Sequence, residues 1–285
     1  MGAVQDSYIL CLHCPDLPGI VAAVACALRD NDCNIEEASQ YNDTEGRFFM
    51  RVVYSSTSGK HDLPAFKKIF ETTAQQFSMD WDITPVSMRP KVLIMVSKED
   101  HCLHDILYRW RTNHLPIDIT AIVSNHEDCY YLAESHGLKF VHLPVSVSNK
   151  AAQEAKLAHI VEETKTELIV LARYMQVLSA DFCSKHAGRI INIHHSFLPG
   201  FKGAKPYHQA HERGVKLIGA TAHFVTADLD EGPIIEQETA RVDHTYNPGK
   251  LQALGRDIEA AVLSRALLSY TERRIFLHGH RTVIL

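Results

Sequence analysis

Several features that would indicate a membrane, secreted or nucleic-acid-binding protein are missing from this chain of 285 residues. Its apolar runs fall short of the roughly 20 residues that span a bilayer. The first residues lack a basic region followed by an apolar segment, and Asp6 stands where a myristoylation signal needs Ser or Thr. The net charge of -5 gives no attraction for nucleic acid or an anionic membrane. We therefore expect a cytoplasmic protein with neither kind of partner.

A complete set of disulfides is also missing, because the chain has seven cysteines, an odd number, scattered along its length. Reduced thiols are typical of the cytoplasm. Cys11 and Cys14 have the C-x-x-C spacing of a metal or redox motif. They lie on a predicted strand, however, and residues three apart on a strand face opposite sides. We therefore expect no shared metal ion there.

The first 86 residues have the order strand, helix, strand, strand, helix, strand, which is the ferredoxin-like βαββαβ arrangement. The expected strands cover 7–13, 34–41, 47–54 and 81–86, and the first helix follows the turn at 15–19. Asp62 is expected to cap the second helix and Pro64 to lie in its first turn. Apolar residues at helical spacing predict the buried sides of the two helices. They are Ile20, Val21, Val24, Ala27 and Leu28, and then Phe66, Ile69, Phe70 and Phe77.

After a short linker at 87–90, strands and helices alternate, which predicts a Rossmann-like, mostly parallel α/β sheet. Ligands of such sheets bind beyond the carboxyl ends of the strands. A final helix after Pro248 carries Leu251, Leu254, Ile258 and Val262 on one side and is expected to cover the sheet. The expected strands are 91–96, 117–123, 139–142, 167–172, 189–194 and 218–226, and the expected helices are 100–112, 127–136 and 150–164.

Polar residues gather at the ends of the last two expected strands. Asn192 and His194 share one face of the strand 189–194, which runs into a Pro/Gly loop at 198–200. The second strand ends in a polar turn that contains Asp230. An amide, an imidazole and a carboxylate are the groups that attack on a carbonyl requires, because they stabilise an oxyanion and move a proton. This combination predicts an active site.

A set of spaced motifs resembles the folate-dependent formyltransferase family. They are Asn192-Ile193-His194, Ser196-Phe197-Leu198-Pro199, His223-Phe224-Val225 and Leu229-Asp230-Glu231-Gly232. The resemblance implies that Asn192, His194 and Asp230 are catalytic. It also implies a folate site to which Met175, Gln176, Val177, Leu178, His223 and Thr226 contribute, with backbone groups of 175–178 holding the pterin ring.

The N-terminal part resembles an ACT domain through Asp16-x-Pro-Gly19 before the first helix and Asn34-Ile35 at the next strand. We therefore expect an ACT-like regulatory or oligomerisation domain at 1–86 and a formyltransferase-like catalytic domain at 87–285. The resemblance implies a homo-oligomer, a dimer or a tetramer, with methionine and glycine as candidate effectors. Alternatively, this domain only holds subunits together.

The segment 96–105 indicates which molecule accepts the formyl group. Family members that act on glycinamide ribonucleotide have a glycine-rich loop here, whose N–H groups approach a phosphate. This chain has no glycine there and three acidic residues, which would repel a phosphate. Water is then the remaining nucleophile, and we expect hydrolysis of 10-formyltetrahydrofolate to formate and tetrahydrofolate, which balances one-carbon folates and supplies formate for purine synthesis. The alternatives are transfer to an unidentified amine and a non-catalytic folate or amino-acid sensor.

Eighteen histidines raise the further alternative of a metal-dependent hydrolase. Candidate ligands are His194, His195, His208, His211, His223 and Asp228. The sequence has no H-E-x-x-H motif, and His194 and His195 are expected on opposite faces of one strand. We therefore expect no metal and no cofactor besides the folate substrate.

Overall fold

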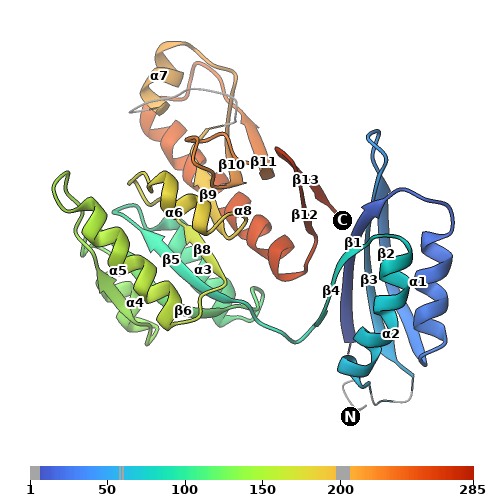
Figure 1. The fold of residues 1–285 in the computed structure, drawn as a ribbon. Coiled ribbons are helices and arrows are strands. Elements are labelled where there is room, and N and C mark those ends of the chain that lie inside the picture. The colour runs from blue at the N-terminus through green and yellow to red at the C-terminus, as the bar shows by residue number, and fades with distance from the viewer. Residues whose placement is uncertain (1–6, 58, 60, 197–205) are drawn as a thin grey trace. The chain divides into compact units, whose positions relative to one another are not determined.

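The computed structural model describes residues 7–57, 59, 61–196 and 206–285. These form two compact units (Figure 1). The first runs to Met88 and also includes Glu272–Phe276 and Val283–Leu285, and the second comprises Arg89–Thr271 and Leu277–Thr282. The domain 87–285 expected from the sequence thus differs at its C-terminal end, where these two pieces group with the first unit. The expected loop at 198–200 lies outside the described residues. Within the described ranges, no helix is long and apolar enough to cross a membrane.

The first unit is an antiparallel four-stranded sheet with the order β2-β3-β1-β4, and two helices cover one of its faces (Figure 1). This confirms the βαββαβ prediction, because the first and third strands are central and the second and fourth lie at the edges. The elements are β1 (Ser7–Pro15), α1 (Ile20–Arg29), β2 (Cys33–Asn42), β3 (Arg47–Ser56), α2 (Leu63–Gln76) and β4 (Asp80–Pro85).

Helix α2 begins as predicted, with the Asp62 carboxylate accepting a hydrogen bond from the Ala65 N–H at 3.0 Å. Phe66 and Phe70 are buried in the core, but Ile69 is 50% exposed, so its predicted burial is wrong. The buried stripe continues through Ala74 and Phe77, which leaves Ile69 to one side. The same error applies to Val21 of α1, which is 42% exposed.

Cys11 and Cys14 lie on opposite faces of β1, as expected. Cys14 belongs to the core beneath the helices, while the Cys11 thiol donates to the Arg273 carbonyl at 3.1 Å. All seven cysteines of the chain are free.

The second unit is built on a seven-stranded sheet with the order β11-β10-β9-β8-β5-β6-β7. The five strands from β9 to β7 are parallel, which confirms the prediction of a mostly parallel sheet. Strand β10 is antiparallel to β9, and β11, which the sequence analysis did not predict, is antiparallel to β10. The strands are β5 (Lys91–Val96), β6 (Asp118–Ser124), β7 (Phe140–His142), β8 (Leu168–Leu171), β9 (Ile190–His194), β10 (Leu217–Phe224) and β11 (Ile234–Arg241).

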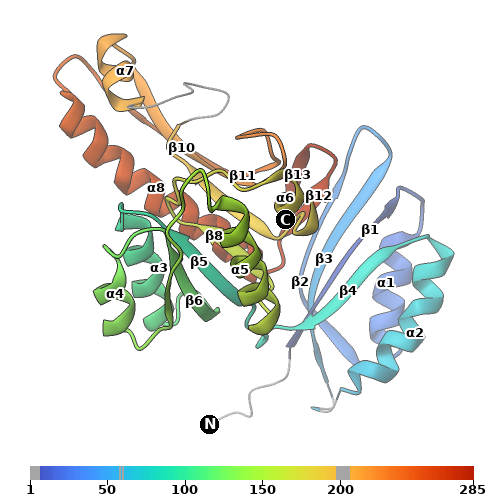
Figure 2. The ribbon, with the colours of Figure 1, turned by 60° about the vertical axis from the view of Figure 1, so that its left-hand side comes forward.

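Helices lie on both faces of this sheet (Figure 2). Leu157 and Ile160 of α5 and Phe182 of α6 pack with alternate residues of the strands on one face. The long helix α8 contacts α3 and the strands β9, β10 and β11. The helices are α3 (His101–Arg111), α4 (Tyr130–Ser135), α5 (Lys150–Glu163), α6 (Ala180–Lys185), α7 (Pro206–Glu212) and α8 (Pro248–Thr271), and a short ribbon of β12 (Ile275–His278) and β13 (Arg281–Ile284) follows.

Candidate active site

Strand β9 places Asn192 and His194 beside a cavity of about 220 Å³ in the second unit. Their two-residue spacing puts both side chains on the same face of the strand, as the sequence predicts. The cavity is also lined by all the other residues that the sequence analysis assigned to the site. They are Met175, Gln176, Val177, Leu178, His223, Thr226 and Asp230.

His223 of β10 lies directly across from Asn192 of β9 in the strand register. It is 1% exposed, and burial lowers its pKa, so the ring is neutral. Its Nδ1 lies 2.9 Å from the Phe224 carbonyl oxygen, which can only accept a hydrogen bond, so Nδ1 carries the proton. Nε2 therefore holds a lone pair and accepts from the Asn192 Nδ2 at 3.2 Å. This fixes the orientation of the Asn192 amide and leaves its second N–H for a ligand.

Asp230 reaches His194 from the loop that follows β10. One of its carboxylate oxygens lies 3.1 Å from the His194 Nδ1, and this hydrogen bond lowers the pKa of Asp230. Asp230 has a left-handed backbone, with φ of 59°, which is uncommon for a residue other than glycine. The His194 Nε2 is buried and has no hydrogen-bond partner among the described residues. Asp230 thus holds His194 by one nitrogen and leaves the other available.

Gly232 allows this loop to fold back onto β10. A Cβ at this position would lie 1.7 Å from the Phe224 carbonyl oxygen, so no side chain fits. The fold-back is needed because β10 runs antiparallel to β9, contrary to the simple picture in which both strands end at the same edge of the sheet. The Leu-Asp-x-Gly motif therefore combines the carboxylate with the glycine that places it.

Ser97 fixes the segment that follows β8, where the sequence predicts folate contacts. The buried Ser97 hydroxyl accepts from the Met175 N–H at 2.9 Å, and the Ser97 N–H donates to the Arg173 carbonyl at 3.2 Å. The Ser97 hydroxyl in turn donates to the Asn125 side-chain oxygen at 2.6 Å. The Met175 N–H is therefore already occupied within the protein. Met175 and Val177 are more than half exposed, which leaves an apolar surface at the cavity.

His194 and His195 do not lie on opposite faces, so that expectation is wrong. Strand β9 ends at His194, and the chain turns away from strand geometry at the next residue. Both rings line the cavity, with centroids 5.0 Å apart and planes 23° from parallel. The directions of these two rings therefore do not oppose a shared metal ion.

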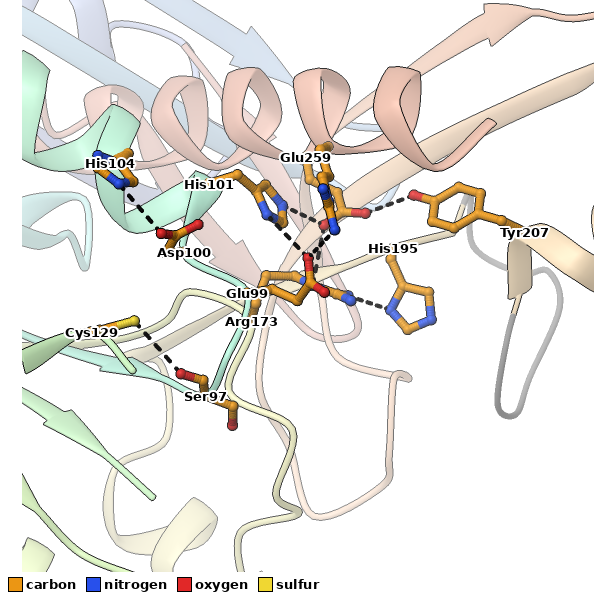
Figure 3. A network of polar contacts seen from close by, with 11 residues as sticks. Ser97, Glu99, Asp100, His101, His104, Cys129, Arg173, His195, Tyr207 and Glu259 are labelled. Carbon is orange, nitrogen blue, oxygen red and sulfur yellow. Dashed lines mark hydrogen bonds and ion pairs between the residues drawn. The ribbon is translucent and has the colours of Figure 1, made fainter. Parts of the chain in front are cut away.

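A buried polar network in the second unit leads to His195 (Figure 3). The Arg173 Nη1 lies 2.6 Å from the His195 Nδ1, and the Arg173 Nε lies 3.2 Å from the Glu259 carboxylate. Glu259 is 1% exposed and is also bound by the His101 Nε2 at 2.9 Å and the Tyr207 hydroxyl at 2.7 Å. Arg173, Ser97 and Glu259 were not predicted as site residues from the sequence. Glu259 could have been found, since it lies at helical spacing from the buried Leu251, Gly255 and Val262.

The structure does not assemble the proposed metal ligands into one group. His208 and His211 lie on α7 away from the cavity, and the His211 Nδ1 lies 3.0 Å from the Tyr246 carbonyl. A close group of potential ligand atoms in the described part of the second unit is His101, Cys102 and Glu259. Its carboxylate is already paired with the Arg173 cation, which opposes metal binding.

Comparisons with known proteins extend over both units. Residues 90–267 match the family model for Formyl transferase, and residues 7–71 match that for the ACT domain. A formyltetrahydrofolate deformylase of Corynebacterium sp. (strain P-1) is 49% identical over 282 residues, with 99% of each chain covered. The crystal structure of formyltetrahydrofolate deformylase from Burkholderia mallei is 53% identical with a TM-score of 0.94, and the match covers 98% of this chain and 99% of that chain.

A glycinamide ribonucleotide transformylase from Symbiobacterium toebii is similar over a smaller part of the chain. It is 31% identical with a TM-score of 0.64, and the match covers 69% of this chain and 94% of that chain. The two-unit arrangement is therefore shared with the deformylases at almost full length.

Proposed function

The chain belongs to the family of formyltetrahydrofolate deformylases, and we propose that it hydrolyses 10-formyltetrahydrofolate in the cavity beside β9. Its ACT and formyltransferase-like parts, both expected from the sequence, are confirmed by the family matches. The observation that carries the proposal is the convergence of Asn192, His194 and Asp230 on one cavity. The products are formate and tetrahydrofolate, so the enzyme balances the one-carbon folate pool and supplies formate for purine synthesis.

Water is the formyl acceptor in this proposal. The acidic side chains between β5 and the first turns of α3 are paired with cations of the protein: Glu99 with Arg256 at 2.7 Å, and Asp105 with Arg109 at 2.8 Å. Asp100 lies 3.4 Å from His104. The segment also contains the exposed Lys98, but it lacks the glycines of a phosphate-binding loop, whose successive N–H groups would hold an acceptor phosphate.

His194 acts as the general base on this water. Asp230 accepts the Nδ1–H, which places the lone pair of the neutral ring on Nε2, the atom without a described partner. Nε2 takes a proton as the water oxygen bonds to the formyl carbon. The C–N10 bond then breaks, His194 returns the proton to N10, and the formic acid formed loses its proton to solvent. Asp230 stays ionised and stabilises the imidazolium that forms between the two steps.

Asn192 stabilises the formyl oxygen while it is negatively charged. One of its amide hydrogens is bound by the His223 Nε2, so the direction of the other amide hydrogen is fixed. A preorganised donor of this kind lowers the barrier by about 3–4 kcal/mol in well-studied enzymes. His223, to which the family resemblance assigns a part in folate binding, thus acts through Asn192. The segment from Met175 to Leu178, together with Thr226, lines the space for the folate ring.

We propose that the reaction requires no metal or cofactor, since base, orienting carboxylate and oxyanion donor all come from side chains in the cavity. Full activity after treatment with EDTA, with no metal found by elemental analysis, is the expected result. Loss of activity that Zn²⁺ or another divalent metal restores would contradict it.

The ACT unit is proposed to regulate the enzyme or to hold subunits together in a dimer or tetramer. Methionine and glycine are the candidate effectors, and adding each to the assay should change the rate if the unit is a sensor. A cytoplasmic location is proposed because all seven cysteines are free, as in reducing compartments.

The test of the function is an assay in plain buffer without any amine acceptor. Purified protein is mixed with 10-formyltetrahydrofolate, and the release of tetrahydrofolate and formate is followed over many turnovers. Equal release of both products supports hydrolysis. Folate binding without release, followed by activity only when an amine is added, would favour a transferase. Binding without turnover under both conditions would favour a sensor.

A further inference from the structure

The Nδ1 of His195 contacts a cation, whereas the Nδ1 of His194 contacts an anion. The Arg173 Nη1 lies 2.6 Å from the His195 Nδ1. A guanidinium has only donors and does not lose its proton in proteins, so it cannot accept a hydrogen bond from the ring. The His195 Nδ1 must therefore hold a lone pair. The proton of the neutral ring is then on Nε2.

The charge state of His195 is equally restricted. Burial and the neighbouring Arg173 cation, with His194 adding to them, lower the pKa of His195 to about 4. Glu259 and Asp230 act in the opposite direction but do not reverse the shift. Above about pH 5 the ring is therefore neutral, in one tautomer, and presents a donor at Nε2.

Arg173 is itself held from several sides. Its Nε faces the buried Glu259 carboxylate at 3.2 Å, and its carbonyl accepts from the Ser97 N–H. Its backbone is left-handed, with φ of 64°, which few residues other than glycine adopt. Tyr207 and His101 also donate hydrogen bonds to Glu259 (Figure 3). The guanidinium is therefore a fixed donor to His195 and not a mobile surface group.

We propose that His195 is a further catalytic residue, a neutral imidazole whose Nε2–H donates a hydrogen bond to the formyl oxygen alongside Asn192. The proposal deepens the proposed hydrolysis and rests on it. His195 lines the same cavity, and its ring stacks on that of His194. A neutral imidazole can stabilise a developing oxyanion without giving up its proton, so His195 is unchanged through the cycle and His194 carries the transferred proton.

The kinetic test uses two variants of similar size. His195→Phe keeps a flat ring but removes the donor, and we expect kcat to fall roughly ten- to a hundredfold with little change in KM. His195→Gln keeps a distal N–H and should recover most of that loss. A purely packing role predicts the reverse order, because Phe preserves the ring and Gln does not. Wild-type kcat in His195→Phe would overturn the proposal, provided that the wild type hydrolyses the substrate.

Nitrogen NMR of histidine-labelled protein tests the tautomer without any turnover. The His195 signals are identified by their disappearance in His195→Gln. We expect a protonated Nε2 and an unprotonated Nδ1 from pH 5 to pH 8. An imidazolium at pH 6, or a proton on Nδ1, would overturn the proposal even if the enzyme is active. If the wild type releases no formate, the proposed function fails, while this spectrum still reports on His195.

Discussion

The two adjacent histidines of the cavity differ in the charge of the group that faces each ring. His194 has its Nδ1 against the Asp230 carboxylate, whereas His195 has the same atom against the Arg173 guanidinium. The first arrangement favours a ring that can take up a proton, and the second favours one that cannot. Both residues are histidines that line the same cavity. The charged partner of each ring, and not the residue type, therefore determines its chemical role.

The partners are also supplied in different ways. Asp230 lies in a loop, has a left-handed backbone itself, and precedes Gly232, where no side chain fits. Arg173 is held by Glu259, which is buried on the long helix α8. The His194 side of the cavity therefore depends on a loop conformation, and the His195 side depends on a buried ion pair. Substitutions can disturb each side separately.

Asp230→Asn should have the largest effect because it removes the anion on the His194 side. The amide can no longer stabilise the imidazolium, and it can hold the ring in the wrong tautomer. We expect kcat to fall about a thousandfold or more, as measured by tetrahydrofolate release. Asp243→Asn is the matched control, since Asp243 is exposed and its carboxylate accepts hydrogen bonds from the N–H and hydroxyl of Thr245 in a turn away from the cavity. A kcat within threefold of wild type would remove Asp230 from the mechanism.

Glu259→Gln should remove the anion that holds Arg173, and with it the fixed position of the guanidinium beside His195. Burial opposes the ionisation of Glu259, but hydrogen bonds from His101 and Tyr207 and the Arg173 charge together lower its pKa. Breaking a buried pair in this way costs about 3 kcal/mol of unfolding free energy at pH 7. A group with a lowered pKa stabilises the fold above its unfolded pKa of about 4.3, and this contribution is lost as the pH falls through the folded pKa.

The difference in stability between wild type and Glu259→Gln should accordingly shrink below about pH 4. Urea unfolding of the second unit can be followed by Trp110 fluorescence in a Trp81→Phe background, because the two tryptophans lie in different units. A difference in stability that stays constant from pH 7 to pH 3 would show that the charge of Glu259 is not what matters.

Asn192→Ala removes the amide that is proposed to donate a hydrogen bond to the formyl oxygen. We expect a loss of kcat of about a hundredfold or more, equivalent to roughly 3 kcal/mol of barrier, with a smaller change in KM. Combined with His195→Phe, the loss should be less than the product of the two single losses if both donors bind one oxygen. Fully multiplicative losses would indicate that the two groups act on different atoms.

Gly232→Ala should have the smallest effect of the four, because it displaces Asp230 without removing it. The added Cβ would meet the Phe224 backbone, which cannot move as a flexible side chain does. We expect kcat to fall roughly tenfold and the unfolding free energy to drop by about 1–3 kcal/mol. Gly249→Ala, whose Cβ would make only an ordinary contact in the first turn of α8, should leave both unchanged.

The sequence predicts one side of this comparison well and the other poorly. Asn192, His194 and Asp230 lie in motifs whose chemistry and spacing are visible in the chain, and strand alternation places the first two correctly. His195 was misplaced because the alternation of strand side chains was extended one residue beyond His194, where the strand was expected to end and does end. Arg173 and Glu259 are far apart in the sequence, at positions that differ by 86. Their pairing depends on where α8 packs against the sheet, which local patterns do not predict. The sequence signal that was available for Glu259 is its charge at a position where helical spacing predicts a buried apolar residue.

The fold itself follows from local patterns where those patterns are strong. Apolar runs such as 91–96 and capping residues such as Asp62 predict their elements correctly. Strand β11 was missed because it is largely polar, Ile235 being its one fully buried residue, and it lies at the edge of the sheet. The exposure of Ile69 shows that helical spacing does not fix the width of a buried stripe.

The most direct test of the central claim is the source of the new oxygen in formate. The wild type and Asp230→Asn are each incubated with 10-formyltetrahydrofolate in ¹⁸O-labelled water at neutral pH without an amine, and formate is analysed by mass spectrometry. The account predicts one labelled oxygen per formate over many turnovers of wild type, and almost no labelled formate from the variant in the same time. Unlabelled formate, or equal labelling rates with the variant, would contradict hydrolysis at this site.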